Sequence, residues 1–115
     1  MIRDWTDIKT IEHYASLWEI YQGLLTERQS KALYAFVFED LSLAEIAEAL
    51  DISRQAVHEQ VQKAATSLDE FEEILSLKLI MDKIRSGLIE IKNLNDISSI
   101  KLAIDKLQQY LDSAK

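Results

Sequence analysis

The sequence contains no cysteine, no proline and only two glycines among its 115 residues. Without cysteine the chain can form no disulfide, no thiolate metal site and no cysteine nucleophile. The scarcity of proline and glycine favours helices joined by short connections, because these residues interrupt helices most strongly. No apolar run approaches the roughly 20 residues of a membrane span. The first residues carry charges throughout and lack the uninterrupted apolar segment of a signal peptide. We therefore expect a helical protein without a membrane span, and this composition is compatible with a cytoplasmic location.

Residue clusters typical of catalysis or metal binding are also lacking. The chain has no glycine-rich phosphate loop and no set of residues at metal-ligand spacing. Glu45 and Glu48 form a carboxylate pair at helical spacing, yet no histidine or basic residue completes a site around them. His13 has no second ligand at a suitable spacing and is expected to be a surface or hydrogen-bonded histidine. We expect no catalytic residue, no metal and no cofactor, and hence a protein that is not an enzyme.

Residues 41–65 carry the clearest pattern in the chain and predict two short helices joined by a tight turn. Ser42 and Glu45 have the spacing of a capping box at the start of the first helix. Ser53 is placed to cap the second helix. The small residues Ala47 and Ala56 would let the two helices cross closely. This is the pattern of a helix-turn-helix motif.

The second helix of this motif would present its first turns outward as a recognition surface. Arginine and glutamine at its start are suited to phosphates or base edges, and the lysine further along is suited to phosphate. The candidate nucleic-acid-binding or partner-binding residues are Arg54, Gln55, His58, Glu59, Gln62 and Lys63.

The charge of the chain bears on what this surface binds. The net charge is −7, whereas affinity for nucleic acid comes largely from neutralising phosphates. Residues 64–76, directly after the motif, hold four acidic and no basic side chains, and only residues 77–115 are net positive. An acidic helix face of this kind is usually a solvated face. DNA, RNA and protein remain open as partners.

Apolar residues at helical spacing predict further helices on both sides of the motif. A first helix over residues 6–22 would bury one stripe, and Thr26 with Gln29 forms a second capping box. The recognition helix is expected to continue past Ala65, with Asp69 on its polar face. The stripe expected in the first helix consists of Ile8, Ile11, Tyr14, Ala15, Trp18 and Tyr21.

The last 39 residues show a heptad-like pattern interrupted by a polar break with a helix cap at Asp96. Two amphipathic helices with a short connection predict an antiparallel hairpin, within which Gly87 allows a bend. We expect residues 1–76 to form a helical domain with the helix-turn-helix at about 42–65, and residues 77–115 to form a hairpin. The hairpin has more apolar area than one seam needs, so the surplus packs on the first domain, on a second copy of the chain or on another protein. Of these we expect a homodimer. The candidate dimerisation residues are Ile84, Leu88, Ile91, Ile100, Ile104, Leu107 and Leu111.

Three segments together, LLTERQ, DLSLAEIAE and SRQAV, resemble the YlxM family of small bacterial proteins. That family resembles the promoter-binding region 4 of sigma factors in its helix-turn-helix. The resemblance implies an all-α fold, with a sigma region-4-like N-terminal domain followed here by the amphipathic hairpin. It also implies a regulatory or accessory role in the signal recognition particle protein-targeting pathway. The implied partners are the particle's GTPase, its RNA, or both, and a DNA-binding transcriptional regulator is the alternative.

Overall fold

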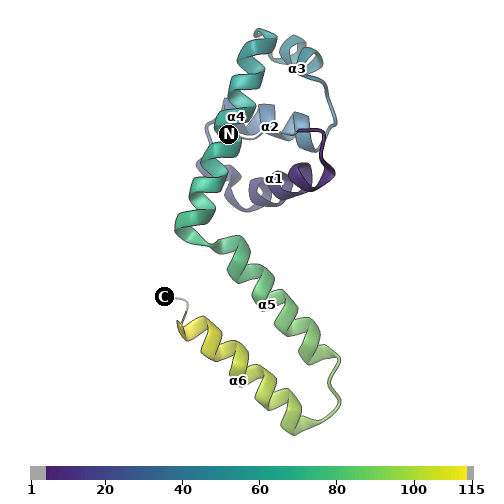
Figure 1. The fold of residues 1–115 in the computed structure, drawn as a ribbon, viewed down its shortest axis with the longest axis vertical. Coiled ribbons are helices and arrows are strands. Elements are labelled where there is room, and N and C mark those ends of the chain that lie inside the picture. The colour runs from purple at the N-terminus through teal and green to yellow at the C-terminus, as the bar shows by residue number, and fades with distance from the viewer. Residues whose placement is uncertain (1–4, 114–115) are drawn as a thin grey trace. The chain divides into compact units, whose positions relative to one another are not determined.

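The computed structural model describes residues 5–113 and contains six α-helices and one short 3-10 helix, with no strand within that range (Figure 1). The predicted all-α fold is therefore confirmed. The chain divides into two compact units, and the boundary lies between Leu75 and Ser76. The elements are α1 (Ile8–Tyr21), η1 (Gln22–Leu24), α2 (Glu27–Val37), α3 (Leu43–Leu50), α4 (Arg54–Leu75), α5 (Leu77–Lys92) and α6 (Ile97–Ser113).

The helices begin where the sequence places hydrogen-bonding side chains. Thr26 before α2 and Ser42 before α3 each form a complete capping box, so both predicted boxes are confirmed. Ser53 Oγ accepts a hydrogen bond from the backbone N–H of Ala56 at 3.0 Å and opens α4. Asp96 accepts one from the N–H of Ser99 at 2.9 Å and opens α6. These contacts satisfy backbone donors that a first helical turn otherwise leaves unpaired.

The core of the first unit forms around α4, against which α1, α2 and α3 all pack. Four of its turns contribute to this core, because apolar residues recur there at three- and four-residue spacing. No polar or charged side chain is fully buried among the described residues. The buried residues are Tyr14, Leu17, Tyr21, Ala32, Leu33, Ala35, Ile46, Ala47, Val57, Val61, Ala64, Ala65 and Leu68.

The buried face of α1 differs in part from the stripe that the sequence predicts. Tyr14, Leu17 and Tyr21 are buried, and Leu17, which the predicted stripe omits, is fully buried. Ile8 is 69% exposed because it lies at the first position of the helix, two turns from the core. Trp5, before the helix, instead packs against Tyr14 and has its ring centroid 5.3 Å away.

The turn between α3 and α4 depends on a left-handed residue. Asp51 ends α3 with φ 55° and ψ 46°, a conformation that aspartate adopts more readily than most residues. Its backbone N–H reaches the carbonyls of Ala47 and Glu48, and the N–H of Ile52 donates to the Ala47 carbonyl at 3.1 Å. This turn brings α3 beside the first turns of α4, so the predicted helix-turn-helix is present (Figure 1).

The second unit is a hairpin in which α5 and α6 run antiparallel and pack together (Figure 1). Gly87 on α5 lies against the side chain of Leu107 on α6. A Cβ atom added there would come within 2.9 Å of Leu107 Cδ1 on α6. Gly87 therefore makes room for a side chain of the opposite helix, and α5 continues as one helix through this position.

Candidate partner-binding surface

The exposed start of α4 is the candidate site that the sequence predicts, and we call its six residues the α4 surface. Five of the six are exposed and Gln62 is half-buried. Arg54 and His58 are one helical turn apart, as are Gln55 and Glu59, so they form two adjacent rows. The surface consists of Arg54, Gln55, His58, Glu59, Gln62 and Lys63.

The α4 surface points outward because the opposite side of the helix is anchored in the core. Val57 and Val61, one turn apart, are fully or almost fully buried, and Ala64 continues that row. The buried Ile46 and Ala47 bring α3 against this row. The helix-turn-helix thus holds the α4 surface on a rigid helix and leaves its polar side chains accessible.

The charge on this surface is mixed. Arg54 and Lys63 are the only basic residues between positions 42 and 75, whereas the same stretch contains eight acidic residues. Glu59 lies inside the surface itself. A polar, mixed-charge helix face of this kind can pair with charged and amide groups of a protein and contact a small number of phosphates.

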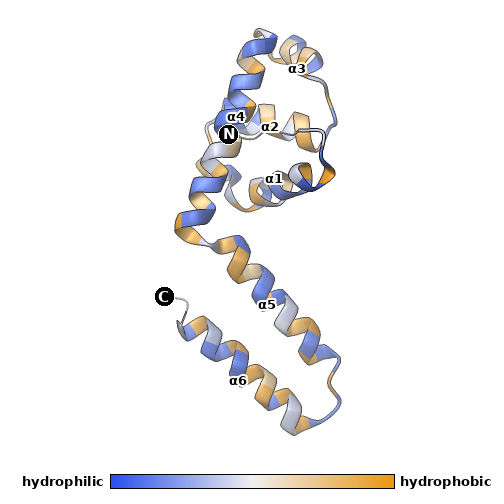
Figure 2. Cartoon of the chain, in the orientation of Figure 1, coloured by the Kyte–Doolittle hydropathy of each residue, from blue (hydrophilic) through white to orange (hydrophobic). Residues whose placement is uncertain are grey.

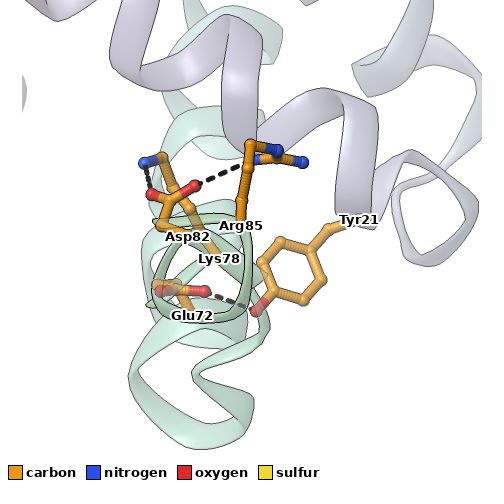
Figure 3. A network of polar contacts seen from close by, with 5 residues as sticks. All are labelled: Tyr21, Glu72, Lys78, Asp82 and Arg85. Atoms are coloured by element: carbon orange, nitrogen blue, oxygen red, sulfur yellow. Dashed lines mark hydrogen bonds and ion pairs between the residues drawn. The ribbon is translucent and has the colours of Figure 1, made fainter. Parts of the chain in front are cut away.

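The acidic second half of α4 is partly structural, which the sequence did not reveal. Tyr14 donates a hydrogen bond to Asp69 Oδ2 at 2.6 Å. Tyr21 donates one to Glu72 Oε1, also at 2.6 Å (Figure 3). The His13 ring also contacts Asp69 Oδ1, at 3.2 Å. Asp69 and Glu72 therefore attach α1 to α4, and the expected solvated acidic face describes this part of the helix only incompletely.

Burial is the largest cause that raises the pKa of Tyr14, and the hydrogen bond to Asp69 and its negative charge raise it further. Tyr14 thus stays protonated as a donor. The sequence signal for this pair was weak, because tyrosines in an apolar stripe are equally typical of plain core packing.

A second exposed feature, which sequence reasoning missed, is an apolar cleft formed by α1, α2 and α3. Its cavity has a volume of about 420 Å³. Trp18 packs against Tyr34 with ring centroids 5.0 Å apart, and Tyr34 stacks on Phe38 at 5.0 Å. Tyr34 and Phe38 are each 40% exposed. The cleft can accept an apolar side chain, and Lys31 and Glu39 are the charged residues among those that line it.

Other site classes have no counterpart among the described residues. Residues 5–113 contain no group of three or more potential metal ligands of the histidine, cysteine or carboxylate type. No helix in this range is both long enough and apolar enough to cross a membrane.

The candidate dimerisation residues divide into two groups in the hairpin. Ile84, Ile91, Ile100 and Leu107 are half-buried along the seam between α5 and α6. Leu88, Ile104 and Leu111 are exposed. The sequence predicts more apolar area than one seam needs, and the structure separates an internal seam from an outer apolar face.

Comparisons with known proteins agree with this architecture. The model of the UPF0122 family, described as "Putative helix-turn-helix protein, YlxM / p13 like", matches residues 8–111. A UPF0122 protein of Halalkalibacterium halodurans is 42% identical over 76 residues, which cover 66% of this chain and 70% of the relative. One of Symbiobacterium thermophilum is 46% identical over 68 residues, covering 59% and 64%. One of Bacillus cereus is 44% identical over 61 residues, covering 53% and 56%. The family match includes the helix-turn-helix and most of the hairpin.

Proposed function

Because the chain belongs to the UPF0122 family of YlxM/p13-like helix-turn-helix proteins, we propose that it is a regulatory or accessory protein of the signal recognition particle pathway. It acts in the cytoplasm by binding protein or ribonucleoprotein, and it catalyses no reaction. The proposed partners are the GTPase of the particle, its RNA, or both. The resemblance carried by LLTERQ, DLSLAEIAE and SRQAV suggests this pathway, and the charge of the helix-turn-helix supports the mode of action.

One observation carries the proposal: the helix-turn-helix has too few basic residues to hold duplex DNA by its backbone. Between positions 42 and 75 there are two basic residues, Arg54 and Lys63, and eight acidic ones. A protein that tracks a duplex typically neutralises about 6–10 phosphates. The exposed Glu70 and Glu73 further along α4 would repel a phosphate backbone lying on their side of the helix. A partner that offers charged and amide groups, together with a small number of phosphates, fits this surface better than a continuous duplex backbone does.

The structure gives the proposed docking surface a clear physical basis. Arg54, Gln55 and His58 project from the first turn and a half of a helix whose other side is fixed in the core. Little side-chain entropy beyond that of these residues is lost on binding, because the helix that carries them is already ordered. Exposed arginine on such a rigid element is a common energetic centre of protein interfaces.

A pull-down tests the proposal directly. The full chain would be immobilised and offered the targeting GTPase with and without its RNA at micromolar concentration. We expect retention of the GTPase or of its complex with RNA. Arg54→Ala should weaken retention, whereas Arg28→Ala should leave it unchanged, because Arg28 is an exposed arginine on α2 outside the α4 surface. The GTPase-only and RNA-only arms identify which component is bound.

Two results would count against this function. Absence of association in all arms would remove the targeting machinery as the partner. Equal loss of retention in Arg54→Ala and Arg28→Ala would show that binding depends on overall charge and not on the α4 surface.

The alternative is a DNA-binding transcriptional regulator, favoured by the position of Arg54 and Gln55 at the start of the second helix of the motif. In that role Arg54, Gln55, His58 and Gln62 would read base edges and Lys63 would contact phosphate. Gel shifts at about 50 mM salt, where phosphate contacts are strongest, distinguish the two functions. A chain that binds neither genomic fragments nor random duplex under these conditions is not a DNA reader. If it binds, Arg54→Ala should cost about 1–3 kcal/mol at the base it reads.

A further inference from the structure

The hairpin of α5 and α6 has no interior of its own. Among residues 76–113 no side chain is fully buried, although both helices are rich in leucine and isoleucine (Figure 2). A two-helix unit has a single seam and cannot cover the remaining apolar side chains by itself. The exposed apolar side chains, with their exposed fractions, include Met81 (43%), Leu88 (51%), Ile97 (72%), Ile104 (47%) and Leu111 (43%).

These five residues form one row on each helix. Met81 and Leu88 are seven positions apart on α5, and positions seven apart lie on the same side of a helix. Ile97, Ile104 and Leu111 are likewise seven apart on α6. Each helix therefore presents an apolar row whose successive members are about two turns apart.

The contact between Gly87 and Leu107 marks the seam and shows where the two rows lie. Leu88 lies about 100° around α5 from Gly87, and Ile104 lies about 60° around α6 from Leu107 in the same rotational sense. Because the two helices run in opposite directions, equal senses of rotation place both rows on the same side of the hairpin. The hairpin thus has one apolar face, which consists of Met81, Leu88, Ile97, Ile104 and Leu111.

The opposite side of the hairpin is polar. A groove of about 580 Å³ runs along it and is lined by charged residues from both helices, including Lys83, Glu90 and Lys106. The ammonium group of Lys83 lies 5.8 Å from the centre of the Tyr110 ring. This groove is suited to water, whereas the apolar face is not.

The size of the apolar face matches that of a stable protein interface. Helices of 16 and 17 residues are about 25 Å long, and two of them side by side are about 20 Å wide, which gives a flat face of about 500 Å². The largest exposed apolar patch of a typical monomer is about 300–600 Å², so this face is comparable to the largest patches that monomers expose. The accessible area of such a ridged face is of the order of the 800 Å² that each partner buries in a standard interface.

We infer that a second copy of this chain covers the apolar face, so that two hairpins form a four-helix bundle. In this bundle α5 of each copy packs against α6 of its partner and runs antiparallel to it, with the two connecting loops at the same end. The bundle has a twofold axis parallel to its helices. Its interior combines the outer rows of both copies, and the Gly87–Leu107 seam remains within each chain. The inference does not depend on what the α4 surface binds.

The charges beside the apolar face support this arrangement. The flank of α5 carries Lys78, Arg85 and Lys92 with one acidic residue, Asp82, which pairs with Lys78 at 2.6 Å and Arg85 at 3.2 Å (Figure 3). The flank of α6 carries two acidic residues and one basic residue: Asp105, Asp112 and Lys101.

Pairing α5 with the partner's α6 places a net positive flank beside a net negative one. The alternative twofold arrangement, with the loops at opposite ends, would pair α5 with α5 and place two positive flanks side by side. Like charges across an interface are unfavourable, so the flanks favour the first arrangement.

The oligomeric state of the full chain tests the inference. Sedimentation equilibrium of the unaltered protein should give twice the chain mass. Leu88→Asp combined with Ile104→Asp should halve it, because four carboxylates per dimer would enter the apolar interior. Both positions are about half exposed within one chain, so the seam should persist and circular dichroism should retain the helical signal. The matched control, Ser86→Asp with Gln109→Asp, changes two residues of the polar groove and should remain dimeric.

Cysteine cross-linking tests the same face without a buried charge. The natural chain has no cysteine, so two variants, Lys92→Cys and Lys101→Cys, each carry a single thiol. In the proposed bundle, residue 92 of one copy is level with residue 101 of the other, since both lie beside the connecting loops. A short bismaleimide should join chains when the two variants are mixed, but should not join either variant to itself.

Three outcomes would overturn the inference. They are a monomeric unaltered protein, a Leu88→Asp/Ile104→Asp variant that stays dimeric, and a mixture of the two cysteine variants that yields no cross-linked product beyond what each variant forms by itself. If the double aspartate variant loses its helical signal, the cross-linking result decides the question.

Discussion

The hydroxyl of Tyr14 on α1 lies 2.6 Å from Asp69 Oδ2 on α4, although the two residues are 55 positions apart in sequence. Tyr21 and Glu72 repeat this relationship one or two turns along the same pair of helices. Two tyrosines on the buried side of α1 thus each donate a hydrogen bond to a carboxylate of α4. These contacts fix the orientation of the helix that carries the α4 surface.

Tyr14→Phe should destabilise the protein by about 1–2 kcal/mol. The variant loses a hydrogen bond to a charged acceptor, which is worth about 1.5–3 kcal/mol, but half-exposed Asp69 can regain water. Urea unfolding measures the change. Tyr34→Phe is the control, because Tyr34 is partly exposed and its ring contacts with Trp18 and Phe38 are retained. Equal effects of the two substitutions would show that the Asp69 contact contributes nothing specific.

The same hydrogen bond predicts a loss of stability in alkaline solution. Burial and Asp69 raise the pKa of Tyr14 above its ordinary value of 10.0. A group with a raised folded-state pKa stabilises the fold fully below the unfolded-state value, and its contribution declines as pH rises through the folded-state value. The free energy of unfolding should therefore decrease above pH 10.0 more steeply in the natural protein than in Tyr14→Phe. Parallel curves for the two proteins would contradict the assignment.

Removal of the cap before α3 should loosen the helix-turn-helix. Ser42 Oγ accepts the N–H of Glu45 at 3.1 Å, and loss of such a cap typically costs about 1 kcal/mol. Ser42→Ala should lower the free energy of unfolding by this amount. Thr66→Ala, an exposed position inside α4, should cause no loss, because alanine is the better helix former there. If Ser42→Ala matches this control, the cap has no energetic role.

Glu45 should make the stability of the fold depend on pH in the acidic range. Its carboxylate accepts the backbone N–H of Ser42 at 3.0 Å, and this bond, followed by the contact with the Ser42 side chain, lowers the pKa of Glu45 below 4.5. A lowered pKa stabilises the fold above the unfolded-state value, and the contribution is lost as pH falls through the folded-state value. Glu45→Gln keeps a bond of the type that Gln29 makes in α2 and cannot titrate. Its thermal midpoint should therefore fall less between neutral pH and pH below 4.5 than that of the natural protein.

Substitution of Gly87 should depend steeply on side-chain size. Gly87→Ala gains about 1 kcal/mol of helix propensity, but its Cβ would lie 2.9 Å from Leu107 Cδ1, a flexible side-chain end that must move. The two effects should nearly cancel. Gly87→Leu should destabilise the hairpin by about 1–3 kcal/mol or more, because its larger side chain would separate α5 from α6. Denaturation followed by circular dichroism measures both variants, and a harmless Gly87→Leu would exclude a tight approach.

The sequence was sufficient to predict the parts of the fold that depend on local chemistry. Both capping boxes and the two amphipathic helices at the C-terminus follow from residues a few positions apart, and so could be recognised. The α4 surface could also be predicted, because the apolar row of a helix determines which of its other side chains point outward. Contacts between distant residues could not be predicted. Periodicity indicates which side of a helix is buried, but not that Tyr14 would meet Asp69.

The role of Gly87 shows the same limit. From the sequence, a glycine inside a helix predicts a local cost and a possible bend. Only the packed hairpin shows that the Leu107 side chain occupies the space that a side chain at position 87 would need. The division of the apolar residues of α5 and α6 into a seam and an outer face likewise required the position of this contact.

The close contact of Gly87 and Leu107 has a consequence for how the hairpin selects its alignment. Sliding α6 along α5 by one turn would bring Leu107 against the branched side chain of Ile84 or Ile91, where no comparable space exists. A heptad-like pattern alone tolerates such slips, because every turn offers a similar apolar residue. The single gap at Gly87 accepts Leu107 in one register only. Gly87, the least bulky residue of α5, thereby fixes the register of α6 along α5.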